Sequence, residues 1–370
     1  MKNIVIAGGG VAAFECAAAV RKENPSANIA IYARECVLPY RRPALSALAA
    51  SNDEPSATFF IKSQEYYSNN NISIYTGNGV SEIFPDEHEI ELDDSTRVKY
   101  DKLVIATGAE ARRIPVSGAD NAFVLRDYND LLTLRKITGN ESKRCAVIGG
   151  GLLGLELADS LLKRGCHVIV IEGAERLLPR NLDKNGSIYL FDAIKNIGKF
   201  EVLLNRKVSE ITSDSVILAD GKVECDLVFL SAGAGAVYPK CPTLQVERAI
   251  VVDKNMKTNL PDIFAAGDCA QFDGFACGLF TEAAAMGKVA GVCAAGGDAE
   301  YRRTVYPARF NALGIKLFSA GNLDESLNSS CEQKDASYKK VFFNSDGTVA
   351  GVILIGDISE SSAFLKQLNN

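Results

Sequence analysis

Lys2-Asn3-Ile4-Val5-Ile6-Ala7-Gly8-Gly9-Gly10-Val11-Ala12-Ala13 opens the chain and decides its fold. The apolar run ends in three glycines and a helix-like stretch over residues 14–21 follows, which predicts a strand, a glycine turn and a helix. Gly8 permits the tight turn, Gly10 leaves room for a pyrophosphate beside the backbone, and Ala13 lets the helix lie close to the strand. Because the first N–H groups of a helix attract an anion, this stretch predicts a dinucleotide-binding unit.

The same pattern occurs a second time. Cys145-Ala146-Val147-Ile148 leads into Gly149-Gly150-Gly151-Leu152-Leu153-Gly154, and residues 155–164 are again helix-like. One copy would be a weak signal, since many apolar strands end in glycine. Val-Ser-Glu-Ile also occurs twice, at 80–83 and 208–211. The repetition predicts two nucleotide-binding domains of like design in one chain.

The remaining segments extend this plan. Alternating residues over 72–99 predict a small antiparallel meander before a buried strand at 103–109, and the second half repeats this sequence of elements. The tail has strand-like runs at 315–318, 338–343 and 349–355 and a helical stretch at 359–368. We expect an α/β fold with two nested Rossmann-like dinucleotide-binding domains and a small α+β C-terminal domain. The expected domains are residues 1–109 with 235–305, residues 110–234, and residues 306–370.

Composition excludes several classes of protein. A hydrophobic content of 47% in 370 residues fits a globular chain, and a net charge of −6 gives no sign of a nucleic-acid or membrane binder. No apolar run reaches about 18 residues, which favours a cytoplasmic protein. The ten cysteines form no CxxC or CxxxxC pair and read as reduced thiols. With two histidines, His88 and His167, we expect neither a His-based metal site nor a Ser-His-Asp hydrolase.

Carboxylates at strand ends indicate which nucleotide is bound. Glu172 ends the second strand of the second copy, where it would accept hydrogen bonds from both ribose hydroxyls and repel a 2′-phosphate. No arginine is adjacent, although Arg176 is near, so the sequence favours NADH over NADPH. In the first copy the strand-end residue is Ala33, and Glu35 is the nearest carboxylate.

The stretch Thr258-Asn259-Leu260-Pro261-Asp262-Ile263-Phe264-Ala265-Ala266-Gly267-Asp268 predicts a short strand that closes on Gly-Asp. An aspartate there, across the sheet from the first glycine turn, can bind a sugar-alcohol hydroxyl of a long cofactor. Residues 278–294 are helical in character, and their first N–H groups could face an electron-rich ring.

Taken together, the motifs resemble the pyridine nucleotide-disulfide oxidoreductase superfamily of flavoproteins with two dinucleotide-binding domains, arranged as in glutathione reductase. The matching elements are residues 8–13, 103–108, 149–156, Glu172 and 260–268. The resemblance implies FAD in the first domain and NADH in the inserted one, with Asp268 at the ribityl chain and Glu156 near the nicotinamide and flavin. The candidate cofactor-binding residues are Gly8, Gly10, Ala12, Ala13, Glu35, Arg42, Pro43, Val80, Ala106, Thr107, Gly108, Arg126, Gly149, Gly150, Gly151, Leu152, Leu153, Gly154, Glu172, Gly233, Gly267, Asp268, Leu279 and Phe280.

Within this superfamily, Leu38-Pro39-Tyr40-Arg41-Arg42-Pro43-Ala44-Leu45-Ser46 resembles the loop of NADH:rubredoxin oxidoreductases and of the flavin domain of nitrite reductases. The short tail is similar to theirs too. The resemblance implies that Arg42 approaches the flavin and stabilises negative charge on it. A lysine that this group tends to carry in the tail is here Asn311.

The missing dithiol motif indicates how electrons leave. With no cysteine pair to relay them, we expect one-electron transfer from the flavin to a small iron protein of the rubredoxin type. Rubredoxin-like proteins are usually acidic, so a basic docking surface is expected. Its candidate residues are Arg41, Arg42, Arg112, Arg113, Arg302 and Arg303.

Two alternatives stay open. Cys36-Val37-Leu38-Pro39-Tyr40 also resembles the coenzyme A disulfide reductases, which implies a redox-active Cys36 thiol stabilised by a helix N-terminus and an NADH-dependent disulfide or peroxide reductase. The residues before it, 32–35, depart from that branch. A flavin component of a nitrite reductase and a non-enzymatic redox sensor are further possibilities. The sequence allows either a monomer or a homodimer.

Overall fold

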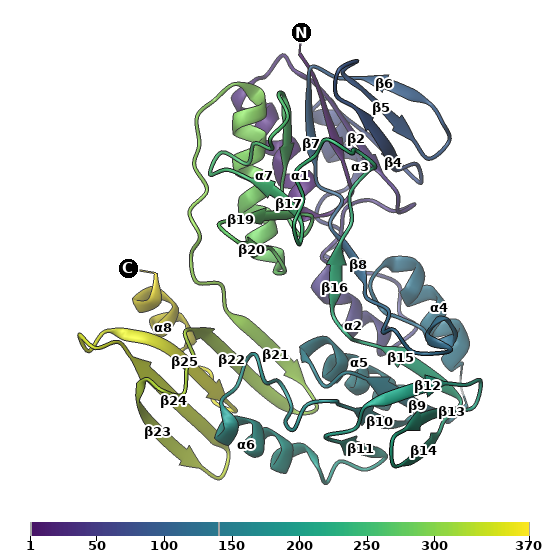
Figure 1. The fold of residues 1–370 in the computed structure, drawn as a ribbon, viewed down its shortest axis with the longest axis vertical. Helices are drawn as coiled ribbons and strands as arrows, with labels where there is room; N and C mark the ends of the chain where they lie inside the picture. The colour runs from purple at the N-terminus through teal and green to yellow at the C-terminus, as the bar shows by residue number, and fades with distance from the viewer. Residues whose placement is uncertain (1, 140, 370) are drawn as a thin grey trace. The chain divides into compact units, whose positions relative to one another are not determined.

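The computed structural model describes residues 2–139 and 141–369. Contacts divide the chain into two compact units (Figure 1). Unit 1 holds the chain up to Ala44, Glu54–Glu110 and Ala234–Arg303. Unit 2 holds Leu45–Asp53, Ala111–Gly233 and the chain from Thr304 onward. The assignment of a cofactor to each domain stays a prediction.

A five-stranded parallel sheet, in the order β18-β7-β1-β2-β3, forms the centre of unit 1. Its central strands are nearly continuous apolar runs because parallel sheets are covered on both faces. The elements of this layer are β1 (Asn3–Ala7), α1 (Val11–Glu23), β2 (Asn28–Ala33), α3 (Gln64–Asn69), β3 (Ile72–Thr76), β7 (Lys102–Ile105), β18 (Ile263–Ala265) and α7 (Phe280–Ala295).

Helices α1 and α7 pack against each other at unusually short range. A Cβ atom at Gly287 would collide with the backbone of Ala12, and one at Gly291 would collide with the Cys16 carbonyl oxygen. Only glycine at these two positions of α7 allows the two backbones to approach so closely. This contact fixes the start of α1, directly after the first glycine turn.

Each unit contains a three-stranded antiparallel meander, which in the chain comes directly before a strand of the parallel sheet, β7 in unit 1 and β15 in unit 2. In unit 1 it comprises β4 (Val80–Phe84), β5 (Glu89–Leu92) and β6 (Arg97–Lys99); in unit 2 it comprises β12 (Val208–Ile211), β13 (Ser215–Leu218) and β14 (Gly221–Glu224). The two Val-Ser-Glu-Ile copies are the first strands of these meanders. Both carry a bulge between the valine and the glutamate, so the repeat extends to the register.

The parallel sheet of unit 2 has the order β11-β10-β9-β15, which matches β3-β2-β1-β7 of unit 1. The predicted fold class is therefore confirmed. The elements are α4 (Tyr128–Thr138), β9 (Arg144–Ile148), α5 (Leu152–Lys163), β10 (His167–Ile171), α6 (Lys184–Ile194), β11 (Phe200–Leu203) and β15 (Leu227–Leu230). Unit 2 also includes α2 (Leu45–Ala49), which the chain supplies before it returns to unit 1.

The tail forms an antiparallel sheet in the order β21-β22-β25-β24-β23, with α8 (Ser361–Leu368) against β25 and β22. The strands are β21 (Ala308–Ala312), β22 (Ile315–Gly321), β23 (Asn328–Lys334), β24 (Ser337–Phe343) and β25 (Val349–Ile355). The sequence predicts β22, β24, β25 and the helix but not β21 or β23. Every residue of β23 is exposed, so no apolar alternation marks it.

Short elements complete the chain. β8 (Ala109–Ala111) and β16 (Ala234–Ala236) form a two-stranded sheet. The others are η1 (Arg42–Ala44), η2 (Ala119–Asn121), β17 (Ile250–Val252), β19 (Ala270–Phe272) and β20 (Phe275–Ala276). Across residues 2–139 and 141–369, no helix has the length and apolar character needed to cross a bilayer.

Candidate dinucleotide sites

The first glycine turn follows β1 and has an open position where a ligand would approach. Gly8 has φ +129°, and a Cβ atom there would collide with the Ala106 carbonyl oxygen. A Cβ atom at Gly9 would lie 2.6 Å from the Ala33 Cβ atom. At Gly10, in contrast, a Cβ atom would meet no atom within 4 Å. The first two glycines are thus required by the protein's own packing, whereas the third leaves space beside the backbone.

The second turn repeats this geometry. Gly149 has φ +114° and would collide with the Ser231 carbonyl oxygen if it carried a Cβ atom, and Gly151 again has no atom within 4 Å. Gly10 and Gly151 are the N-caps of α1 and α5, and neither helix has a side-chain cap or an acidic residue in its first turn. Their first N–H groups are therefore available to an anion. Both turns fit a dinucleotide pyrophosphate.

Several predicted residues of unit 1 gather at the carboxyl ends of its parallel strands. The Ala106 amide donates to the Ala7 carbonyl oxygen over 2.7 Å, which places the Ala106–Gly108 segment beside the first turn. A Cβ atom at Gly267 would lie 3.0 Å from the Ala12 Cβ atom. Asp268 follows directly and is half-buried. Ligands of such sheets bind at this edge, so the placement favours the predicted site.

Glu35 and Arg42, predicted as separate cofactor contacts, are bonded to each other. Arg42 Nη2 lies 2.5 Å from Glu35 Oε1, and the two side chains are 29% and 22% exposed. The Tyr40 hydroxyl donates to Glu35 Oε2 over 2.7 Å, and the Arg42 guanidinium lies 5.1 Å from the centre of the Tyr40 ring. Tyr40 is thus part of this cluster, a role that no sequence motif indicates.

Glu172 lies against the second glycine turn. Its Oε2 atom accepts from the Gly150 amide over 2.7 Å, and its Oε1 atom accepts from the Ala174 amide over 2.7 Å. Strand register shows why the first copy has no carboxylate equivalent to Glu172. The last residue of β1 pairs with Tyr32, and the last residue of β9 pairs with Ile171, so Ala33 occupies the position of Glu172. No carboxylate in the described structure takes that register position in unit 1.

Glu156 lies on α5 and contacts the α2 segment. The Ser46 hydroxyl donates to Glu156 Oε2 over 2.9 Å, and the Ser160 hydroxyl donates to the Ser46 carbonyl oxygen over 2.5 Å. Burial raises the pKa of Glu156 above its ordinary value, the hydrogen bond from Ser46 lowers it, and the nearby Asp159 charge raises it further. Ser46 stands in the predicted loop motif, but only the structure identifies it as a partner of Glu156.

Replacing Glu156 with glutamine is expected to stabilise the protein near pH 8. A carboxyl group whose pKa is raised by folding costs no stability below its unfolded value, here 4.5, and becomes destabilising as the pH rises through its folded pKa. The gain in melting temperature of E156Q should therefore vanish towards pH 4.5. Glu201, exposed on β11 of the same unit, offers the control variant E201Q. A difference between E156Q and wild type that is constant with pH would contradict this assignment.

The other predicted residues are scattered among several elements. Val80 is buried on β4, Pro43 lies in η1, and Leu279 and Phe280 begin α7 in unit 1. In unit 2, Leu152 and Leu153 form the first turn of α5, and the Arg126 amide donates to Asp130 Oδ2 over 2.8 Å ahead of α4. Gly233 has φ +91° and is the last residue of the loop between β15 and β16. A Cβ atom at Gly154 would collide with the Gly149 carbonyl oxygen, so α5 needs glycine there.

Cys36 is exposed and lies in a bend after β2. The next helical turn in the chain begins at Arg42, so Cys36 does not stand at a helix N-terminus of its own segment. All ten cysteines are free thiols. Within the described residues, no three or more His, Cys, Asp and Glu side chains gather as a metal site.

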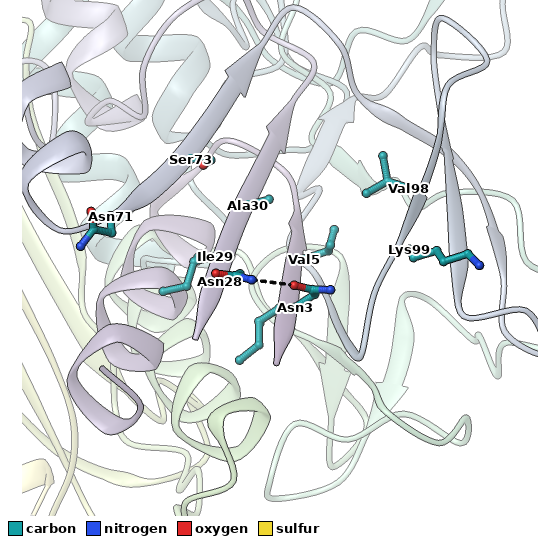
Figure 2. Close-up of a pocket in the computed structure, with 10 residues that line it drawn as sticks. Asn3, Val5, Asn28, Ile29, Ala30, Asn71, Ser73, Val98 and Lys99 are labelled. Carbon is teal, nitrogen blue, oxygen red and sulfur yellow. Dashed lines mark hydrogen bonds between the residues drawn. The ribbon is translucent and has the colours of Figure 1, made fainter. Parts of the chain in front are cut away.

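One hollow in unit 1 lies away from the glycine turn. Figure 2 shows its lining from β1, β2, β3 and β6, with Asn28 bonded to Asn3. Asn3 and Asn28 are the first residues of β1 and β2, whereas the turn follows the carboxyl end of β1. Since ligands of parallel sheets bind at the carboxyl ends, this hollow is not the nucleotide site.

Two known protein families match parts of this chain. Residues 2–290 match the pyridine nucleotide-disulphide oxidoreductase family, and residues 308–370 match the rubredoxin NAD+ reductase C-terminal domain. The chain belongs to the pyridine nucleotide-disulphide oxidoreductase family. The predicted superfamily is thereby confirmed, and the second match extends over the tail of this oxidoreductase.

Two curated relatives and one solved structure are similar to this oxidoreductase. The NADH-rubredoxin oxidoreductase of Clostridium acetobutylicum is 31% identical over 373 residues, which cover 100% of this chain and 94% of the relative. The nitrite reductase [NAD(P)H] of Bacillus subtilis is 31% identical and covers 99% of this chain, but the match spans only 47% of that protein. The crystal structure of NADH:rubredoxin oxidoreductase from Clostridium acetobutylicum has a TM-score of 0.82 at 28% identity, over 99% of this chain and 94% of that one.

Proposed function

We propose that this oxidoreductase takes a hydride from NADH with FAD as its bound cofactor and passes electrons to a small iron protein, most closely of the rubredoxin type. The observation that carries the proposal is the pair of glycine turns, each open at its third glycine, in a chain whose tail matches the rubredoxin NAD+ reductase C-terminal domain. Flavin, when bound, accepts two electrons from NADH and can release them singly.

The residues of each unit would hold one nucleotide. In unit 1, the N–H groups after Gly10 would bind the FAD pyrophosphate, and Asp268 would accept hydrogen bonds from its sugar-alcohol chain. In unit 2, the N–H groups after Gly151 would bind the NADH pyrophosphate, and Glu172 would bind its ribose hydroxyls. The hydrogen bonds that Glu172 accepts from two backbone amides fix the orientation of its carboxylate. A 2′-phosphate would meet that negative charge, which favours NADH.

Arg42 would act on the flavin with a positive charge that is also paired with the Glu35 carboxylate. The ion pair and the stacking of the guanidinium on Tyr40 hold Arg42 in one orientation.

Among the arginines proposed for docking, Arg303 is held over the exposed Phe275 ring at 3.7 Å. Arg113 donates to the carbonyl oxygens of Ala119 and Ala122. Docking by these arginines stays a proposal, as does a cytoplasmic location for a protein with seven buried free thiols.

An anaerobic titration followed by a steady-state screen tests the function. The purified protein should be yellow, and stoichiometric NADH should bleach the flavin band. Turnover should then be fastest with rubredoxin, and slower with a nitrite reductase partner, coenzyme A disulfide or dioxygen. Flavin that binds but is not reduced by NADH would favour a redox sensor, and a colourless protein that cannot be loaded would refute the proposal.

Replacing Cys36 with serine should leave turnover with rubredoxin within about twofold of wild type. The thiol is exposed, and no helix of its own segment begins at Cys36 to stabilise a thiolate. Steady-state rates of C36S and wild type at saturating NADH provide the measurement. Cys331, exposed on β23, supplies the control C331S. A loss of rubredoxin-dependent turnover in C36S alone would favour the single-cysteine reductase instead.

A further inference from the structure

The segment between β10 and α6 is attached to the second glycine turn at two places. The Ala174 amide donates to Glu172 Oε1 over 2.7 Å, and the Leu178 amide donates to the Gly150 carbonyl oxygen over 3.4 Å. Arg176 lies between these attachment points. On the proposed function, the adenosine ribose of the nucleotide would bind Glu172, so Arg176 belongs to the segment that borders this ribose.

The Arg176 side chain is paired with a carboxylate from the C-terminal sheet. Arg176 Nη1 lies 3.1 Å from Glu325 Oε1, and the arginine side chain is only 25% exposed. The same oxygen accepts from the Lys184 amide over 3.2 Å at the first residue of α6. Glu325 lies in a turn between β22 and β23 where Asp324 Oδ1 accepts from the Ser326 amide over 2.9 Å. Glu325 Oε1 therefore has two partners, the Arg176 guanidinium and the Lys184 amide.

A 2′-phosphate carries a charge of about −1.5 to −2, and proteins bind such groups preferentially with arginine. Arg176 is the arginine nearest to Glu172 in the chain. We propose that Glu325 is a specificity-determining residue that keeps this oxidoreductase selective for NADH by neutralising Arg176. The inference rests on the proposed binding of NADH by unit 2. The C-terminal region would then contribute to nucleotide selectivity through Glu325, in addition to the repulsion of a 2′-phosphate by Glu172.

Replacing Glu325 with glutamine tests this inference, since it removes the charge and keeps the size of the side chain. The probes are 2′,5′-ADP, which carries the 2′-phosphate, and 5′-ADP, which lacks it, titrated calorimetrically into the full-length protein loaded with FAD. We expect E325Q to bind 2′,5′-ADP about three- to tenfold more tightly than wild type, with 5′-ADP changed by less than about twofold. The ratio of kcat/KM for NADPH to that for NADH should rise by a similar factor.

Two further variants identify the cause. The double variant E325Q/R176A should lose the gain, because the released guanidinium is the group that would bind the phosphate. The matched control E360Q removes a carboxylate that lies 2.7 Å from Lys339 elsewhere in the C-terminal region, and should leave both affinities unchanged. Unchanged binding of 2′,5′-ADP by E325Q, or a gain that persists in the double variant, would overturn the inference. A wild-type protein that binds neither ADP nor NADH would instead overturn the function proposed for unit 2.

Discussion

Replacing Gly10 with alanine should give a folded protein that binds FAD much more weakly than wild type. Gly10 has φ −93° and ψ −171°, which alanine adopts readily, and a Cβ atom there meets no protein atom within 4 Å. The added methyl group would instead lie where the pyrophosphate approaches the backbone. We expect FAD affinity to fall roughly 10- to 100-fold, as for overpacking of a close contact. Flavin absorbance after gel filtration and thermal unfolding of the FAD-free protein provide the two measurements.

Neighbouring glycines supply the controls for G10A. Gly8→Ala introduces a side chain at φ +129° that collides with the Ala106 carbonyl oxygen, so it should destabilise even the FAD-free protein. Gly151→Ala, the equivalent of G10A in unit 2, should keep FAD and weaken NADH binding instead. If G10A retained FAD as wild type does, the pyrophosphate would not lie at this turn.

The glycine turns could be predicted from sequence because their geometry depends on residues that are adjacent in the chain. Gly8 and Gly149 have positive φ angles that follow directly from a strand reversing into a helix. The internal repeat could be predicted for the same reason, down to the Val-Ser-Glu-Ile strands. Two different sequences then fold to the same strand order, because the alternation and the apolar runs specify it.

The partners of charged side chains could not be predicted in this way. Glu35 and Arg42 each read as a cofactor contact, and only the folded loop shows that they form an ion pair. Arg176 and Glu325 are far apart in the chain, so no local pattern links them. The contacts of α2 with α5 are tertiary and could not be predicted for the same reason. β23 is not predicted because none of its residues is buried, so no alternation marks it.

Replacing Asp183 with alanine should destabilise unit 2 by about 3–5 kcal/mol, the usual cost of removing one member of a buried ion pair. The Asp183 side chain is 1% exposed and lies 2.8 Å from Lys340 Nζ, whose side chain is 12% exposed. The Tyr338 hydroxyl donates to the same carboxylate over 3.0 Å, and the Gly186 amide donates to it at the start of α6. The substitution leaves an ammonium group and a hydroxyl buried without their acceptor. Urea unfolding followed by circular dichroism measures the loss.

Two more variants separate the charge from the helix cap. Asp183→Asn keeps an acceptor for the Gly186 amide, because asparagine caps helices as well as aspartate does, but it leaves the Lys340 ammonium unpaired. The double variant D183N/K340M removes both charges and should recover most of the stability, since no buried charge is then left unpaired. Recovery would show that the penalty arises from the unpaired charge and not from lost packing. A loss below about 1 kcal/mol in both D183A and D183N would mean instead that water reaches Lys340 easily. Asp183 would then contribute no more stability than a helix cap does.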